Sequence, residues 1–225
     1  MTSEATPVGA PDVRREQMLR AAAEIIGERG FSETRIADVA RRSNASPALV
    51  IYYFSTKDQL LTEALRFSED LFYADVAGRL ADLTTARDRL ELLVRLTCVP
   101  PGDDETPGAW GLWFDLWAQA FRHPDVAKDR IELDQRWRDT IADVVRDGQA
   151  RGELGPVDAA GFAITFSALL DGLAIQVALE DPVVDPDRAF AIAMRFAAGE
   201  LEVNWRPRRT RRATNAASGR SRRAR

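Results

Sequence analysis

Two chemically reactive residue types are almost absent from this chain. Its 225 residues include one cysteine, Cys98, and one histidine, His123. A single cysteine excludes an internal disulfide framework and a four-cysteine zinc site, and it fits a reducing compartment such as the cytoplasm. Because the histidine has no second histidine and no nearby cysteine in sequence, we predict no metal site, and no cofactor motif is present.

Long apolar runs and targeting segments are also missing. No stretch approaches the ~18 to 20 apolar residues of a membrane span, and the N-terminal MTSEATPVGAPD lacks a basic segment followed by an apolar core. We therefore expect a soluble cytoplasmic protein. The sequence shows no glycine-rich phosphate loop, serine nucleophile elbow or metal-ligand spacing. Nothing in it supports an enzyme.

Basic residues are concentrated at the C-terminal end. The net charge is −4, yet the last twenty residues contain nine arginines and no acid, which leaves 22 basic and 35 acidic residues in 1–205. An acidic body excludes DNA binding by general charge and confines it to a local site. The tail (206–225) and the N-terminal arm (1–11) are predicted to be disordered. The tail either attracts phosphates non-specifically or is solvated with little effect.

Residues 34–57 have the pattern of two short helices joined by a tight turn. Thr34 is predicted to cap the first helix, and Ser46 to cap the second, with Pro47 at its first position. Asn44 suits the left-handed conformation that ends the first helix. A helix-turn-helix has this form, and its second helix enters a DNA major groove. A packed helical hairpin without a DNA role has the same spacing.

The same stretch resembles the DNA-binding head of the tetracycline-repressor (TetR) family of bacterial transcription regulators. The family pattern is a helix opening at Thr, an Ile/Val-Ala pair, a Gly-Val-Ser turn, a Tyr-x-x-Phe helix end and a later Lys. The matching residues here are Thr34, Val39-Ala40, Asn44-Ala45-Ser46, Ile51-Tyr52-Tyr53-Phe54 and Lys57, within a match over about residues 12–65. Asn44 replaces the glycine, Ala45 the valine, and Ile51 a tyrosine that reaches a phosphate in the family.

The resemblance implies two groups of DNA contacts. One group positions the head on phosphates: Thr34, Arg35, Ser46, Tyr53 and Lys57. The other meets base edges, with apolar contacts to thymine methyls: Pro47, Ala48, Leu49 and Tyr52. A capping box at Ser55 and Asp58 is expected to start the next helix, whose first amides suit a phosphate.

The resemblance also implies an all-α fold of about nine helices, with a three-helix head (12–57) and a helical body (58–205) for ligand binding and dimerisation. Apolar periodicity predicts the remaining helices over 12–29, 58–80, 86–98, 108–122, 125–151, 157–179 and 187–205. The last two are assigned to a two-fold dimer interface through Phe162, Phe166, Leu170, Phe190, Met194 and Ala197. The alternative is that these residues form the core of one protomer.

The richest aromatic run lies in the predicted helix over 108–122. Trp110, Trp113, Phe114, Trp117 and Phe121 share one helical face, which is either ordinary core or the wall of a ligand cavity. The predicted ligand set is Trp110, Trp113, Phe114, Trp117, Trp137 and Asp171. Tryptophan faces with a carboxylate suit an organic cation. Asp171 paired with an arginine, or placed at the dimer interface, is the alternative.

Residues 110–179 resemble more loosely the C-terminal domain of the choline-responsive betaine-operon repressor branch of the family. The resemblance lies in WxxWxxxWAQAFRHP, GQARGEL and LLDGLAIQ. Together the two resemblances imply a dimeric repressor that releases a palindromic operator when a small molecule, either cationic or aromatic, binds the C-terminal domain. The alternative is a dimeric ligand-binding adaptor with a vestigial helix-turn-helix.

Overall fold

The computed structural model describes residues 10–99, 109–121 and 124–205, and within these ranges the chain folds into nine α-helices with no strands. The all-α prediction is confirmed. The helices are α1 (Ala10–Arg29), α2 (Ile36–Arg42), α3 (Pro47–Phe54), α4 (Lys57–Ala81), α5 (Ala86–Cys98), α6 (Ala109–Ala120), α7 (Pro124–Ala150), α8 (Ala159–Ala178) and α9 (Pro186–Glu200). Residues 1–9, His123 and the Arg-rich tail lie outside the described residues.

The turn between α2 and α3 forms as its sequence predicts. Asn44 has a φ of 53°, in the left-handed region that asparagine tolerates. Ser46 caps α3 by accepting a 3.1 Å hydrogen bond from the Leu49 amide, and Pro47 follows at the first helical position. These local signals set the start and direction of α3.

Two predicted caps are wrong. Thr34 is fully buried and its hydroxyl donates to the Gly30 carbonyl at 2.8 Å, so it closes the end of α1 while α2 begins after Arg35 without a side-chain cap. Ser55 has a φ of 59° and lies outside α4. Thr56 is the cap instead, because its hydroxyl accepts from the Gln59 amide at 3.1 Å.

The head has an apolar core that extends beyond its three helices. The core residues of α1, α2 and α3 pack on the first turns of α4 and on Val126 of α7, with Trp113 of α6 against its edge. The buried members are Met18, Leu19, Ala21, Ala22, Ile25, Ile26, Phe31, Val39, Ala40, Val50, Phe54, Leu60, Leu61, Ala64, Leu65 and Val126. The packed head therefore includes residues after position 57 and contacts parts of the body directly.

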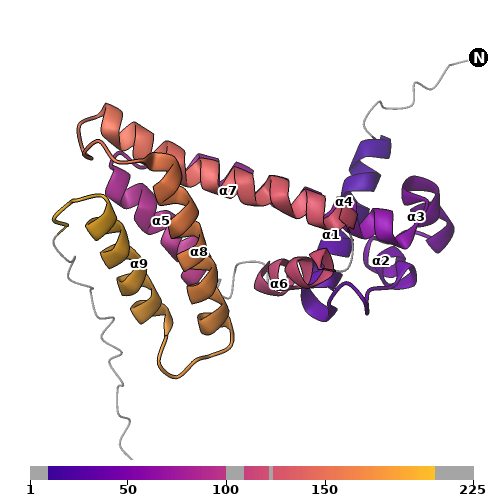
Figure 1. Ribbon diagram of the computed structural model, residues 1–225. Helices are drawn as coiled ribbons and strands as arrows, with labels where there is room; N and C mark the ends of the chain where they lie inside the picture. The colour runs from indigo at the N-terminus through magenta and orange to yellow at the C-terminus, as the bar shows by residue number, and fades with distance from the viewer. Residues whose placement is uncertain (1–9, 100–108, 122–123, 206–225) are drawn as a thin grey trace, which may run out of the picture.

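The body is a helical bundle that follows the head through α4, and α7 also reaches the head at Val126. Figure 1 shows α7 running from beside the head to the far end, where it lies with α5, α8 and α9, while α6 crosses next to the head. The second core lies among these helices and includes Leu90, Ile141, Phe166, Leu170 and Leu201. Thus α4 and α7 contribute residues to both cores, whereas α6 packs on the edge of the head core.

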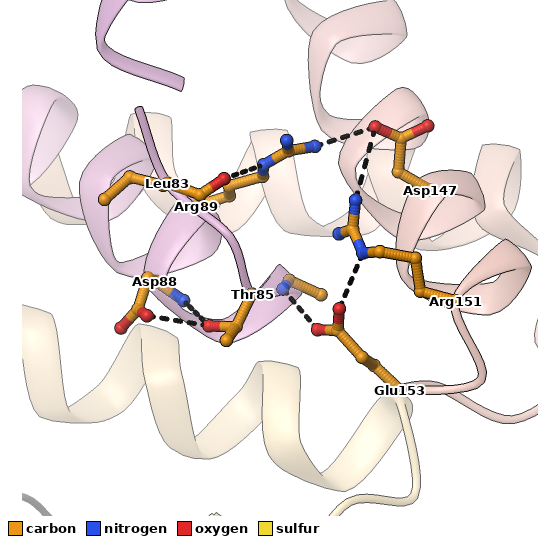
Figure 2. A network of polar contacts seen from close by, with 8 residues as sticks. Leu83, Thr85, Asp88, Arg89, Asp147, Arg151 and Glu153 are labelled. Atoms are coloured by element: carbon orange, nitrogen blue, oxygen red, sulfur yellow. Dashed lines mark hydrogen bonds and ion pairs between the residues drawn. The ribbon is translucent and has the colours of Figure 1, made fainter. Parts of the chain in front are cut away.

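A polar network closes the far end of the body (Figure 2). Arg89 donates to the Leu83 carbonyl at 3.0 Å and to Asp147 at 2.7 Å. Glu153 accepts from the Ala86 amide at 2.6 Å and from Arg151 at 2.6 Å. The bond from the Ala86 amide, with that from Arg151, lowers the pKa of the Glu153 carboxyl. The network ties the start of α5 to the end of α7.

The predicted dimer residues on α8 point the wrong way. Phe162, Phe166 and Leu170 are buried in the protomer's own core, and so is Ala197 of α9. Phe190 and Met194 are half-buried against that core. The error arises because α8 is apolar on nearly every side, so its sequence does not distinguish its inner face from its outer face.

The outer side of α8 is apolar as well. Ile164 is 60% exposed and Leu179 is 76% exposed. By length and composition α8 could cross a membrane, so the expectation that no segment approaches a span was wrong. Its inner side, however, belongs to the core shared with α5, α7 and α9.

The last helix ends earlier than predicted. Its terminal turn closes through Glu202, which has a φ of 52°, and the Val203 amide donates to the Ala198 carbonyl at 3.0 Å. This is the geometry of a helix C-terminus that reverses direction. Residues 201–205 then fold back along the body, where Leu201 is buried.

Candidate functional site

The outer face of α3 consists of Pro47, Ala48, Ile51 and Tyr52, which are all exposed. Tyr52 is 80% exposed and packs edge-on against Tyr53, with ring centroids 5.6 Å apart. On the inner side, Val50 and Phe54 are fully buried in the head core. The helix is thus anchored by its inner residues and presents a small, partly aromatic surface, as a major-groove helix requires.

The predicted phosphate residues divide into four that are exposed or half-buried and one that is fully buried. Arg35 and Ser46 are exposed, and the Ser46 hydroxyl can still donate because its cap bond uses only an oxygen lone pair. Lys57, in the first turn of α4, donates to the Ser32 carbonyl at 3.1 Å and is half-buried. Thr34 is fully buried, so its assignment as a phosphate contact is wrong.

Leu49 and Tyr53 lie between the two sides of α3. Both are half-buried and pack against the edge of the head core. Their exposed portions border the outer face, so they could contact DNA bound on that side. The structure therefore places six of the predicted residues on α3 and its cap, with Arg35 directly before α2 and Lys57 at the start of α4.

The second candidate site is an aromatic cavity of about 90 Å³ within the body. Five helices contribute to its wall: Phe72 and Tyr73 (α4), Leu96 and Thr97 (α5), Trp113, Phe114 and Trp117 (α6), Arg130, Leu133, Asp134 and Trp137 (α7), and Asp171 and Ala174 (α8). Of the predicted ligand residues, Trp113, Phe114, Trp117, Trp137 and Asp171 line it. The Trp110 side chain lies outside what the structure describes.

The aromatic rings form most of this wall. Phe72 packs edge-on against Trp113 with centroids 6.3 Å apart, and Phe114 lies 5.9 Å from Trp117. Phe121, which the spacing placed on the same stripe, is 91% exposed, because α6 ends at Ala120 before reaching it. The stripe is therefore the wall of a cavity at Trp113, Phe114 and Trp117.

Charged groups of both signs meet in the cavity. Arg130 makes an ion pair with Asp134, and its guanidinium carbon lies 4.9 Å from the Trp117 ring centroid and 5.8 Å from that of Trp113. Burial raises the pKa of the Asp171 carboxyl, and the charges of Arg130 and Arg138 oppose this rise. Burial also lowers the pKa of Arg130, while Asp171 and buried Glu69 oppose that change.

Arg130 was not among the residues expected at the cavity, although a signal for it was present. Arg130, Leu133, Asp134 and Trp137 are spaced at 3, 4 and 7 positions, which is one face of α7. The expectation rested on the tryptophans and the acids, so the arginine on the same face was passed over. The α4 and α5 residues carry no such signal, since only tertiary packing brings them to the cavity.

Another face of α6 contacts the head. The Asp115 carboxylate accepts a hydrogen bond from the Phe31 amide, directly after the end of α1. A methyl group added at Gly111 would lie 2.9 Å from the Gly27 carbonyl oxygen, so α6 and α1 approach closely here. The same short helix therefore touches the cavity through its tryptophans and the head through Gly111 and Asp115.

A second, more open hollow lies beside the aromatic cavity. It measures about 330 Å³ and is lined by α4, α5 and α7, with Tyr73 on the boundary. Its charged residues are already engaged, because Asp147 binds Arg89 and Asp143 binds Arg146 at 2.7 Å. The smaller aromatic cavity, which combines aromatic rings with charged groups, is therefore the better candidate for a ligand site.

Comparison with known proteins covers both parts of the chain. The profile of the bacterial regulatory proteins of the tetR family matches residues 18–64, and that of the BetI-type transcriptional repressor C-terminal domain matches residues 86–202. The regulator BetI of Rhizobium meliloti is 26% identical over 198 residues, covering 88% of this chain and 94% of that protein. BetI of Escherichia coli K12 is 27% identical over 202 residues, covering 88% and 98%.

A solved structure is similar over nearly the same length. It is a transcriptional regulator from Saccharomonospora viridis in complex with choline, 30% identical to this chain, with a TM-score of 0.74. The similarity covers 84% of this chain and 98% of that one. Head, body and their arrangement are thus shared with bacterial regulators.

Proposed function

The chain belongs to the TetR family of bacterial transcriptional regulators, with a BetI-type C-terminal domain, and from this we propose that it is a dimeric repressor that releases its operator when a small organic cation enters the aromatic cavity. The observation that carries the proposal is α6, which lines the cavity with three aromatic residues and contacts the head through Asp115 and Gly111.

The proposed DNA surface is the outer face of α3 with its neighbours. Tyr52 and the small side chains of Pro47 and Ala48 would meet base edges, where an apolar contact recognises a thymine methyl group. Arg35, Ser46 and Lys57 would position the head on phosphates, and Lys57 shares its place with the N-terminal amides of α4. Exposed Ile51 lies among these residues as a further apolar contact.

The proposed dimer surface is the outer side of α8. Ile164 and Ile175 are 60% and 38% exposed on α8, whose one charged residue is Asp171, and Leu179 directly after the helix is 76% exposed. Pairing with a second copy would remove this apolar area from water, and a two-fold axis would place the two heads on a palindromic operator. Half-sites about 34–36 Å apart correspond to one turn of DNA.

The proposed effector is a small cation with an apolar surface. Aromatic faces attract a cation through their quadrupoles, and half-buried Asp171 supplies a compensating charge. The choline complex of the S. viridis relative supports this class. Choline is therefore the first candidate to test, and tetramethylammonium is the simplest ion of the class.

Release would follow from movement of α6. An effector that binds better when the tryptophans shift also favours the accompanying shift of Gly111 and Asp115 against α1. The equilibrium between the two head spacings then shifts, and the size of the shift is set by the effector's differential affinity for the two forms. The DNA-bound and effector-bound arrangements are the two states required.

The test is a gel-shift titration of the chain's own upstream DNA across a salt series, with and without choline, after sedimentation has measured the oligomeric state. We expect a dimer and a band that survives competitor DNA, disappears in a Tyr52→Ala, Lys57→Ala double variant, and weakens with choline. A folded dimer that binds no specific genomic fragment would instead support the adaptor alternative. A specific band that tetramethylammonium and choline leave unchanged would refute the effector class alone.

A further inference from the structure

Arg130 occupies the part of the cavity where a cation would bind. Its side chain is 11% exposed, and its guanidinium faces both Trp117 and Trp113 at 4.9 and 5.8 Å. Both distances are within the ~6 Å over which a cation is attracted to an aromatic ring. The position of a bound organic cation is thus filled by a side chain of the protein itself.

The remaining space is smaller than a protein cavity that holds a molecule of similar size. The cavity measures about 90 Å³, whereas a protein cavity that admits benzene measures about 150 Å³. Choline has about as many heavy atoms as benzene. Movement of a lining side chain would give the ligand more room, and Arg130 is the lining residue with the same charge as the ligand.

Arg130 is also held imperfectly. A guanidinium has five N–H donors, and here the Nε donor is buried without a hydrogen-bond partner among the described residues, while an Nη atom pairs with Asp134. An unsatisfied buried donor is costly. A quaternary ammonium has no N–H groups, so it fills the same position without leaving a donor unsatisfied.

We propose that Arg130 is a built-in occupant of the effector cavity, and that a cationic ligand binds by displacing its guanidinium from the faces of Trp113 and Trp117. This inference rests on the proposed effector site and adds a competition step to it. The displaced side chain leaves Asp134 and Asp171 to the ligand. Ligand affinity then depends on the difference in binding free energy between the ligand cation and the Arg130 guanidinium at this position.

An opposite role for Arg130 makes different predictions. If its guanidinium instead anchors the carboxylate of a zwitterionic ligand, removing it weakens trimethylglycine and does not strengthen a simple cation. If Arg130 is an occupant, removing it strengthens tetramethylammonium. The two ligands share a trimethylammonium group and differ in the carboxylate, so they separate the roles.

The experiment is a calorimetric titration of tetramethylammonium, choline and trimethylglycine into the full chain and its Arg130→Met variant. Methionine keeps much of the length and apolar volume but cannot pair with an acid. We expect tetramethylammonium and choline to bind about tenfold more tightly, because a competent state populated about one-tenth of the time raises the apparent Kd by that factor. Methylguanidinium should compete with tetramethylammonium in the variant, since it restores the missing occupant.

Arg138→Met is the matched control. Arg138 lies on the same helix and influences Asp171 electrostatically, yet it donates to Gln135 at 3.0 Å and does not line the cavity. We expect its affinity for tetramethylammonium to change less than twofold. An equal gain in both variants would show that net charge, rather than occupancy, controls binding, and would overturn the proposal.

A further variant covers the case in which Arg130→Met does not fold, as judged by circular dichroism and thermal melting. Arg130→Lys keeps the positive charge but loses the planar group that stacks on the rings, so we expect an intermediate gain in affinity. No gain in the folded variant overturns the occupant role while wild-type binding upholds the effector site. No binding of these cations by any folded variant refutes the proposed effector class itself.

Discussion

The outer face of α3 and the aromatic cavity are built in different ways. The face comes from one helix of eight residues, with its cap and turn beside it in sequence. The cavity takes its wall from five helices, and residues 72 and 174 meet across it. A surface from one segment depends on a few local signals, whereas a cavity depends on the packing of the whole molecule.

The largest expected effect is on DNA binding by the outer face of α3. Tyr52→Ala should lower affinity for the operator about 30-fold (~2 kcal/mol), as expected for a residue that reads a base, and leave non-specific binding nearly unchanged.

Lys57→Ala should weaken binding to all DNA sequences alike and reduce the salt dependence of binding by about one counterion. Fluorescence anisotropy with operator and scrambled DNA measures both.

Arg146→Ala supplies the control for charge. Arg146 pairs with Asp143 on α7, away from the head, so its loss should leave DNA affinity within about twofold. Effector affinity should be unaltered in Tyr52→Ala. If that variant lost effector binding as well, the two regions would not be separable.

The next effect belongs to the cavity. Asp171→Asn keeps the shape of the side chain and removes its charge, so affinity for tetramethylammonium should fall about tenfold (~1.4 kcal/mol). The fold should be as stable or more stable, because burial disfavours the ionised carboxyl. Calorimetry and thermal melting provide the two readings. Asp143→Asn, at an exposed ion pair, is the control that should bind normally.

A smaller effect is expected at the connection between the regions. Gly111→Ala places a methyl group 2.9 Å from the Gly27 carbonyl, which forces α6 away from α1 and lowers the free energy of unfolding by roughly 1–3 kcal/mol. The change in DNA affinity caused by effector should shrink about threefold, within the usual range of coupling energies. The measurement is operator affinity with and without choline.

Gly78→Ala is its matched control. This glycine lies within α4, and nothing stands within 4 Å of an added methyl group. Alanine there should raise stability by about 0.5–1 kcal/mol and leave the coupling unchanged. If effector changed DNA affinity equally in the two variants, the α6–α1 contact would have no role in the release mechanism.

The smallest effect concerns pH. Burial raises the pKa of Asp171 above its ordinary value, and a bound cation favours the ionised carboxylate and lowers that pKa again. Cation affinity is therefore full above the pKa of the free protein and falls as the pH drops through it. We expect a loss of about twofold to threefold on moving from neutral to mildly acidic buffer, and little pH dependence in Asp171→Asn.

Local chemistry made much of the fold predictable from the sequence. Asn44, Ser46 and Pro47 determine the turn and the start of α3, since each acts through its own backbone or a bond three residues away. The helix over residues 86–98 was predicted with the bounds that α5 has. The aromatic side chains of α6 could be assigned to one face because helical spacing alone places them there.

Tertiary structure decided which side of each element faces a partner. Thr34 was expected at the surface, but it is buried and its hydroxyl donates to the Gly30 carbonyl. Phe166 was expected at a dimer interface and lies in the core, since α8 is apolar all round and only its neighbours select the inner side. Arg130 lies over two tryptophans of another helix, a contact between distant segments that no local pattern encodes.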